Sequence, residues 1–259
     1  RANQIGGTEA DSVKTIDANT SGWAYVGGSF EGTADLHPWT SVQNYTSAGG
    51  SDAFMLRMNW AGTSLTWAHQ IGGTGADEAY DLVIDASDNV HVSGTFEDVV
   101  DFDPGAGGYL LTSAGHRDIF MLKLTSGGVY TWGCQMAGHV EDFAYGIDID
   151  TSGNLHITGL FRSAEIDMDP TSEVYNLHSS RGRDTFYITR LDIDGKFVSA
   201  DVVGGSSAQV GGYATLVDSS GDIYLTGTFS GTADFDPDPG ASNTLTSSSF
   251  DGFFVKLQP

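Results

Sequence analysis

The sequence is poor in cysteine, in basic residues and in long apolar runs, and each shortage excludes a class of protein. A single cysteine, Cys134, rules out an internal disulfide and gives no support to a small disulfide-stapled module. No run of about 18 apolar residues occurs, so no membrane-spanning segment is predicted. Only 11 basic residues stand against 34 acidic ones, which gives a net charge of −23. That charge repels phosphate, so nucleic acid and anionic membrane surfaces are poor partners, whereas cations and basic proteins are favoured.

Sequence patterns of catalysis are also lacking. There is no Gly-x-Ser-x-Gly nucleophile motif, and no two histidines have the spacing of a zinc site. Carboxylate pairs, which glycoside hydrolases need, are abundant. They recur throughout the chain, however, whereas a catalytic pair usually occurs once. We therefore expect a protein that is not an enzyme, and keep a hydrolase or lyase as the enzymatic alternative.

What the sequence does contain is repetition. The stretch Asp101-Phe102-Asp103-Pro104-Gly105 recurs as Asp35-Leu36-His37-Pro38, Asp167-Met168-Asp169-Pro170 and Asp234-Phe235-Asp236-Pro237. Its first aspartate advances by 66, 66 and 67 residues. So regular a period indicates that one structural unit is repeated four times.

Each repeat contains short alternating segments that predict antiparallel strands. In repeat two they span 79–85, 90–94, 118–124 and 129–136, and the long loop with Asp101 separates the second from the third. The corresponding segments are 13–17, 23–27, 53–58 and 64–71 in repeat one, 145–150, 154–159, 186–191 and 196–203 in repeat three, and 213–218, 222–227 and 253–257 in repeat four.

Repeat four ends after its third strand, and a matching fourth strand stands at the other end of the chain. Residues 1–7 resemble 67–73, the end of the fourth strand of repeat one. We therefore predict an all-β, four-bladed β-propeller with four antiparallel strands per blade, whose ring is closed by the N-terminal strand. It forms a single domain over 1–259, with repeats of about 8–73, 74–138, 139–205 and 206–259 plus 1–7. Because Arg1 stands where a methionine would begin a new chain, we expect a piece of a longer product.

The residues now allow a family comparison. Segments 145–150, 153–157 and 186–192 are similar to an NHL-type propeller blade, and 231–237 and 251–257 closely match the SBBP-type β-propeller repeat of secreted Bacteroidetes and related bacterial proteins. This resemblance covers the whole chain. It implies a propeller in an extracellular or cell-surface setting and says little about activity.

In an NHL-type blade, three acidic positions of each repeat are expected to meet on one face. They lie in the loop that crosses from the preceding repeat, in the long loop, and at the start of the third strand. The candidates are Asp11, Asp35 and Asp52 with His37 in repeat one; Asp77, Asp101, Asp103 and Asp118 in repeat two; Asp142, Asp167, Asp169 and Asp184 in repeat three; and Asp234, Asp236 and Asp251, with Gln209 near the crossing position, in repeat four.

Two interpretations of these acids remain open. Converging carboxylates repel each other unless a cation neutralises them, and oxygen ligands beside glycine-rich loops suit Ca²⁺. One structural Ca²⁺ per repeat is then expected, best formed in repeats two and three. Alternatively, the first aspartate of the motif accepts loop amide hydrogens as an Asx turn while proline fixes the bend. The motif lacks the ligand spacing of an EF-hand.

Other polar residues receive structural interpretations. His91 and His156 share one strand position and are expected to pack between blades, while Cys134 takes the position of His69 as a core thiol. Turn formation accounts for acids at the first hairpin, namely Asp17, Asp85, Asp148, Asp150 and Asp218. The strand-three cations Arg57, Lys123, Arg190 and Lys256 either pair with acids or bind an anionic ligand, and Arg190 stands one residue later than the others, which predicts a bulge.

We therefore expect a secreted or cell-surface interaction or adhesion scaffold whose partner is a protein or a glycan. A lectin-like sugar-binding module is one alternative, for which Trp39 and Trp60 break the repeat and are candidate exposed aromatics. A structural subunit of an extracellular assembly is another.

Overall fold

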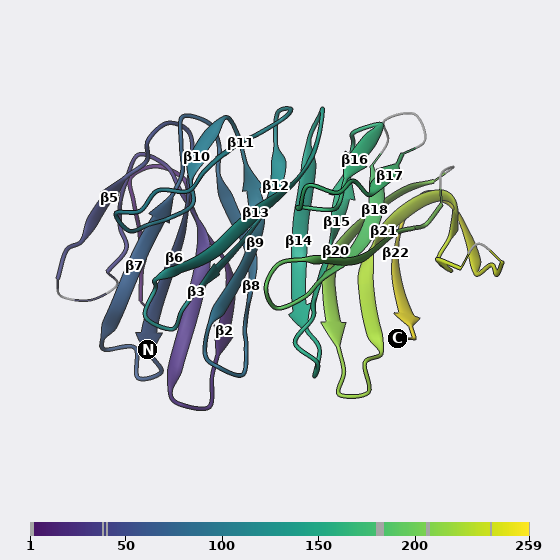
Figure 1. Ribbon diagram of the computed structural model, residues 1–259. Coiled ribbons are helices and arrows are strands. Elements are labelled where there is room, and N and C mark those ends of the chain that lie inside the picture. Colours follow the sequence, from purple (N-terminus) through teal and green to yellow (C-terminus); the bar gives the residue numbers. More distant parts are fainter. Residues whose placement is uncertain are drawn as a thin grey trace. The chain divides into compact units, whose positions relative to one another are not determined.

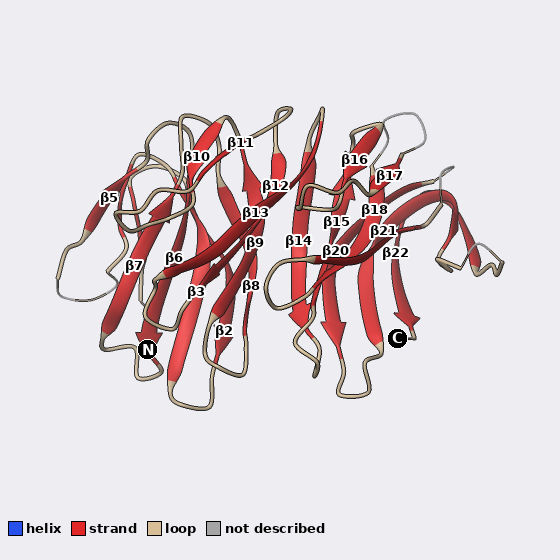
Figure 2. Cartoon of the chain, viewed as in Figure 1, coloured by secondary structure: helices blue, strands red, loops and turns tan. Residues whose placement is uncertain are grey.

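The structure is a computed structural model that describes residues 3–37, 39, 41–179, 184–205, 208–238 and 240–258. These residues form strands, and Figure 2 shows no helix among them. The described part of the chain accordingly holds no helix long and apolar enough to cross a membrane. The chain divides into two compact units, an N-terminal unit of Arg1–Ser113 and Phe120–Cys134 and a C-terminal unit of Ala114–Ile119 and Gln135–Pro259.

Repeat one forms a four-stranded antiparallel sheet in the N-terminal unit, in the order β2-β3-β6-β7 (Figure 1). Its strands are β2 (Asp11–Ala18), β3 (Trp23–Phe30), β6 (Asp52–Asn59) and β7 (Leu65–Ile71). Repeat two follows the same plan with β8 (Glu78–Ile84), β9 (Val90–Phe96), β12 (Asp118–Leu124) and β13 (Tyr130–Gly138). Strands β12 and β13 have residues in both units.

The C-terminal unit holds the sheets of repeats three and four. Repeat three gives β14 (Asp142–Ile149), β15 (Leu155–Phe161), β18 (Thr185–Leu191) and β19 (Phe197–Val203), in the order β14-β15-β18-β19. Repeat four gives a three-stranded sheet of β20 (Gln209–Val217), β21 (Ile223–Asp234) and β22 (Thr244–Leu257). Among the described residues, the predicted strands are present except the closing fourth strand of repeat four, and most of them are one to three residues longer at an end.

The long loop is more ordered than the sequence indicates, because it folds into a hairpin in each repeat. The hairpin strands are β4 (Thr33–Asp35) with β5 (Asn44–Thr46), β10 (Val99–Asp101) with β11 (Leu110–Thr112), and β16 (Glu165–Asp167) with β17 (Asn176–His178). In repeat four the far parts of β21 and β22 pair in the same way.

The loop hairpin of one repeat pairs with the end of the fourth strand of the preceding repeat. Ala137 and Gly138 of β13 pair with Asp167 and Ile166 of β16, and Gly204 forms a bridge with Asp234. Glycine is required at such positions, since a Cβ on Gly73 would collide with the backbone carbonyl of Val99. Successive repeats are therefore joined by backbone pairing as well as by side-chain packing.

The core lies between successive sheets. The middle strands β9 and β15 are buried along their whole length, as strands covered on both faces must be. In the N-terminal unit, Tyr25 and Met55 of repeat one pack in one cluster with Leu82 and Phe120 of repeat two. In the C-terminal unit, Phe186 and Val203 of repeat three share a cluster with residues of repeat four.

The described strands form six sheets and not the closed ring of four that the sequence predicts. Two of the six are small sheets made by the loop hairpins. Strand β1 (Gly6–Gly7) pairs with β4, Gly6 opposite Asp35 and Gly7 opposite Ala34, and no described strand pairs with the outer edge of β22. Arg1, Ala2 and the motif proline Pro38 lie outside the described residues.

Candidate functional site

The first aspartate of the repeated motif holds its own hairpin loop together. Oδ1 of Asp101 accepts hydrogen bonds from the amides of Asp103 at 3.0 Å and Tyr109 at 2.6 Å. The same two bonds recur at Asp35 to His37 and Gln43, at Asp167 to Asp169 and Tyr175, and at Asp234 to Asp236 and Asn243. At Asp234, the amides of Asn243 and Asp236 lower the pKa of the carboxyl group. The Asx-turn geometry is therefore present in all four repeats.

The second motif residue lies in the core, and its burial explains why the loop must close there. Phe102 is fully buried and packs against Phe96 and Phe120 at ring-centroid distances of 5.2 and 4.9 Å. The counterparts Leu36, Met168 and Phe235 are also buried. The third residue makes a further turn: Asp103 accepts from Gly105 at 2.8 Å and Asp169 from Thr171 at 2.9 Å. Asp236 accepts from Asp238, whereas His37 lies edge-on to Trp39.

The crossing-loop acids lie beside the strand-three acids of the preceding repeat, not beside those of their own. Asp77 accepts from the amides of Gly73 at 2.7 Å and Glu97 at 3.1 Å, while its own amide donates to Ser51, next to Asp52. Asp142 takes the same place one repeat later, where its amide donates to Arg117, next to Asp118. The sequence predicts that these acids meet the long loop of their own repeat. In the structure they pair instead with acids of the preceding repeat, across the junction of two repeats.

Both carboxylate pairs are fully enclosed. Asp52, Asp77, Asp118 and Asp142 each have no exposed surface. Asp52 accepts from the side chain of Gln70 at 2.6 Å, and Asp118 accepts from the amide of Gly138 at 3.2 Å. Burial raises the pKa of Asp77 to about 7 and that of Asp118 to about 6, and the charges of Asp52 and Asp142 raise them further. Burial also raises the pKa values of Asp52 and Asp142.

The third junction differs from the first two. Asp52 pairs with Phe30 in repeat one, but in repeat three the residue that pairs with the corresponding Phe161 is Thr185, not Asp184. Similarly Val210, not Gln209, occupies the place of the crossing acid, since it pairs with Phe229 as Asp142 does with Phe161. Asp184 instead accepts from Arg162 at 2.7 Å and from Gln209 at 2.9 Å. Repeat three therefore does not reproduce the acid arrangement of repeat two, and the late position of Arg190 reflects the early position of Asp184.

The predicted bulge at Arg190 is present, but it is not specific to repeat three. The register shifts between Arg190 and Leu191, and it shifts likewise between Arg57 and Met58 in repeat one. The remaining candidate acids make local contacts: Asp11 accepts from the amide of Gly7 at 2.6 Å, and Asp251 from the hydroxyl of Ser247 at 2.7 Å.

The acids of the first hairpin do two different things. Asp85, Asp150 and Asp218 accept hydrogen bonds from turn amides, as expected. Burial alone would raise the pKa of Asp85, but hydrogen bonds, led by those from Asn89, lower it to about 2. Asp17 and Asp148 reach into the next repeat, where they accept from the amides of Ile84 at 3.0 Å and Val217 at 2.6 Å. No pattern in the sequence predicts this bridging role.

The predicted packing residues are largely where expected. His91 and His156 are buried, with Nε2 at 3.2 Å from Asp85 and Asp150 respectively. Cys134 is half-buried, and burial raises the pKa of its thiol to about 12. Trp60 is 59% exposed, whereas Trp39 is only partly so.

No group of three or more histidine, cysteine or acidic side chains in the described residues is arranged to hold a metal ion. Calcium binding by the candidate aspartates stays a prediction.

Comparison with known proteins supports a repeat β-propeller in general terms. No protein-family model matches the chain. The chain is similar to an uncharacterized WD repeat-containing protein (L264) of Acanthamoeba polyphaga mimivirus, with 25% identity over 126 residues. The match covers 43% of this chain and 9% of that protein. It agrees with an all-β repeat fold and does not show the SBBP-type family.

The enclosed carboxylate pairs predict a stability that falls as the pH rises through neutrality. The folded-state pKa values of Asp77 and Asp118 lie above the ~3.9 of an unfolded aspartate, so the folded state binds these protons more tightly. Their contribution is complete below pH ~4 and is lost as the pH rises through 6 to 7, at ~1.4 kcal/mol per unit of pKa difference. Thermal melts between pH 5.5 and 8.5 should show a falling midpoint.

The variant Asp77→Asn should flatten this pH dependence even though its midpoint is lower throughout. Asp11→Asn, at the same place in repeat one but partly exposed, is the matched control and should retain the parent's slope. If the melting midpoint fell equally steeply with pH in the parent and in Asp77→Asn, Asp77 would be ionised across the whole pH range.

Proposed function

We propose that the chain is a β-propeller scaffold that binds protein partners through the tips of its hairpin loops. The observation that carries this proposal is the repeated pair of Asx hydrogen bonds, which fixes the base of each long loop in the same way and leaves its tip free to vary. Loops on a rigid frame are where binding residues concentrate, and propellers are frames of this kind.

The loop tips differ from one repeat to the next in both shape and polarity. Val42 and Val174 are 74% and 69% exposed in repeats one and three, where repeat two has the glycine-rich segment 105–108. The chain as a whole is strongly acidic, with a net charge of −23. Exposed apolar tips in an acidic field suit a basic partner that also presents apolar side chains.

Selection from a displayed peptide library on the immobilised chain tests this function. Enriched peptides should be basic with apolar residues, and binding should weaken with rising salt. The double variant Val42→Ser with Val174→Ser should bind them at least fivefold more weakly at an unchanged melting temperature. Enrichment no greater than on an unrelated protein of similar net charge would overturn the proposal.

Closure of the ring by the N-terminal segment belongs to the same proposal. Gly6 and Gly7 pair with β4 as the end of β13 pairs with β16, which supports the proposal that they are the end of a fourth strand. The sheet β20-β21-β22 is the one that lacks a fourth strand among the described residues. We infer that the segment leading to Gly6 adds to the edge of β22 and so removes an open edge that would favour aggregation.

Removal of residues 1–7 should therefore lower the melting temperature and promote association through β22. A synthetic peptide with the sequence of residues 1–7, added in excess, should restore both properties in part, whereas a scrambled peptide should not. A truncated protein with the parent's melting temperature and elution volume would contradict ring closure.

We also propose, from the family resemblance, an extracellular or cell-surface setting in which the scaffold acts in adhesion. From the recurring aspartates of the loops, we propose that Ca²⁺ stabilises these loops. Both loop amides bind Oδ1 of Asp101, which leaves Oδ2 available as an oxygen ligand. Millimolar Ca²⁺ should then raise the melting temperature relative to chelator, because a ligand bound only by the folded state stabilises it. The double variant Asp101→Asn with Asp103→Asn should respond less. If the parent melted at the same temperature with Ca²⁺ and with chelator, calcium binding would be contradicted.

A further inference from the structure

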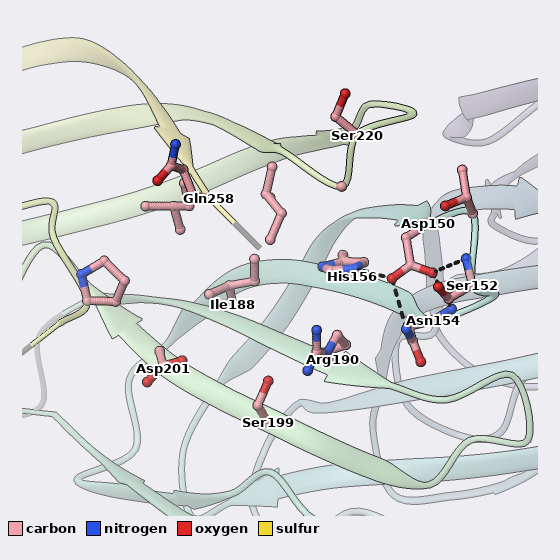
Figure 3. Close-up of a pocket in the computed structure, with 15 residues that line it drawn as sticks. Asp150, Ser152, Asn154, His156, Ile188, Arg190, Ser199, Asp201, Ser220 and Gln258 are labelled. Carbon is pink, nitrogen blue, oxygen red and sulfur yellow. Dashed lines mark hydrogen bonds and ion pairs between the residues drawn. The ribbon is translucent and has the colours of Figure 1, made fainter.

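A cavity of about 450 Å³ opens in the C-terminal unit between the sheets of repeats three and four (Figure 3). One side is formed by His156 on β15 and Arg190 on β18, with Ser199 and Asp201 on β19. The apolar wall consists of Ile188, Ile223 and Leu257. This size and mixture of apolar wall and few polar groups are typical of a small-molecule site.

Arg190 is the cation of this cavity, and it differs from its counterparts in the other repeats. Lys123 forms an ion pair with Asp85 at 3.4 Å, Lys256 forms one with Asp222, and Arg57 lies over the Trp23 ring at 4.1 Å. Nε of Arg190 is buried without a hydrogen-bond acceptor, as is Nε of Arg57, but in the described part of the chain Arg190 has neither an ion pair nor an aromatic ring beneath its guanidinium. Figure 3 shows Arg190 beside the cavity with no interaction drawn to it.

The acid at the position that pairs with Lys123 in repeat two does not pair with Arg190. Asp150 stands where Asp85 stands and accepts the same kinds of hydrogen bond, from the amides of Ser152 and Asn154, from the Asn154 side chain and from His156. Asp85 pairs in addition with Lys123 at 3.4 Å, whereas no ion pair joins Asp150 to Arg190 in the described part of the chain. The guanidinium therefore offers a planar set of donors to the cavity, a geometry that matches a carboxylate.

His156 supplies a second unfilled group, and it lines the cavity. Its side chain is 3% exposed, its Nε2 contacts Asp150 at 3.2 Å, and its Nδ1 is buried without a partner. Nδ1 of His91 is also without a partner, but only that of His156 belongs to a residue of this cavity. Burial lowers the pKa of His156, so the ring is neutral near pH 7. With Nε2–H donated to Asp150, Nδ1 is an acceptor that requires an O–H or N–H donor.

We propose that this cavity binds a small hydroxylated carboxylate, either a free hydroxy acid or the uronic acid unit of a glycan. The ligand's carboxylate pairs with the Arg190 guanidinium, one hydroxyl donates to Nδ1 of His156, and its carbon skeleton packs against Ile188, Ile223 and Leu257. Ser199 and Asp201 accept the remaining hydroxyl hydrogens at the far side. One residue of the cavity, Pro237, belongs to the long loop of repeat four, but the binding proposed for this cavity does not depend on the scaffold function.

NMR titration of the whole chain with glucuronate, glucose and propionate tests the proposal. We expect glucuronate to bind with a Kd of about 1 mM, at least tenfold more tightly than glucose, which lacks the carboxylate, or propionate, which lacks the hydroxyls. The Nε–H signal of Arg190 should shift on binding. Equal affinities for the three compounds, or no shift with glucuronate, would overturn the proposal.

Two pairs of variants separate binding from folding. Arg190→Gln and His156→Phe should each weaken glucuronate binding at least fivefold, while Lys123→Gln and His91→Phe, at the matching positions of repeat two, should leave it unchanged. A loss of binding in both pairs would trace the effect to stability and overturn the assignment. Glucuronate and its methyl glycoside identify the source: equal binding assigns a glycan terminus, and preference for the free compound assigns a free hydroxy acid.

Discussion

The structure depends on one contact made four times, the hydrogen bonds from two loop amides to the first aspartate of the motif. Through Asp101 Oδ1, the amides of Asp103 and Tyr109 are held together and the hairpin closes over its base. Only with the loop closed does Phe102 enter the core against Phe96 and Phe120. The same hairpin then presents the edge on which the preceding repeat's last strand ends, as β16 does for β13. A short polar turn thus sets the packing inside a repeat and the connection between repeats.

Burial at the connections has an electrostatic consequence. Asp77 and Asp142 bind backbone amides at the point where two repeats meet, and the acids of the preceding strand three, Asp52 and Asp118, are enclosed beside them. Their amide donors favour ionised carboxylates, while burial favours protonated ones, and burial is the stronger effect. Many of the acids that make the sequence so negative are consequently structural, so net charge alone overstates the field available for attracting a partner.

Much of the fold could be predicted from the sequence, because strand alternation and the motif period are local or periodic signals. In the part of the chain that the structure describes, the strands lie where they are predicted except the fourth strand of repeat four, and the turn chemistry of Asp101 was one of two open alternatives. The pairing of acids could not be predicted, because it is decided by register across a junction. Asp184 and Gln209 each miss the expected position by one residue, and Thr185 and Val210 stand there instead. The unpaired state of Arg190 could not be predicted either, since Asp150 accepts the same kinds of hydrogen bond as Asp85, and Asp85 does pair with a strand-three cation.

Amide hydrogen exchange measured by NMR in calcium-free buffer tests the central claim most directly. The amides of Gln43, Tyr109, Tyr175 and Asn243 donate to the motif aspartates in their respective repeats. Although they lie in loops, all four should exchange slowly, at rates close to those of the hairpin strands beside them. Exchange as fast as that of the loop-tip amides, or slow exchange only after Ca²⁺ is added, would contradict the account.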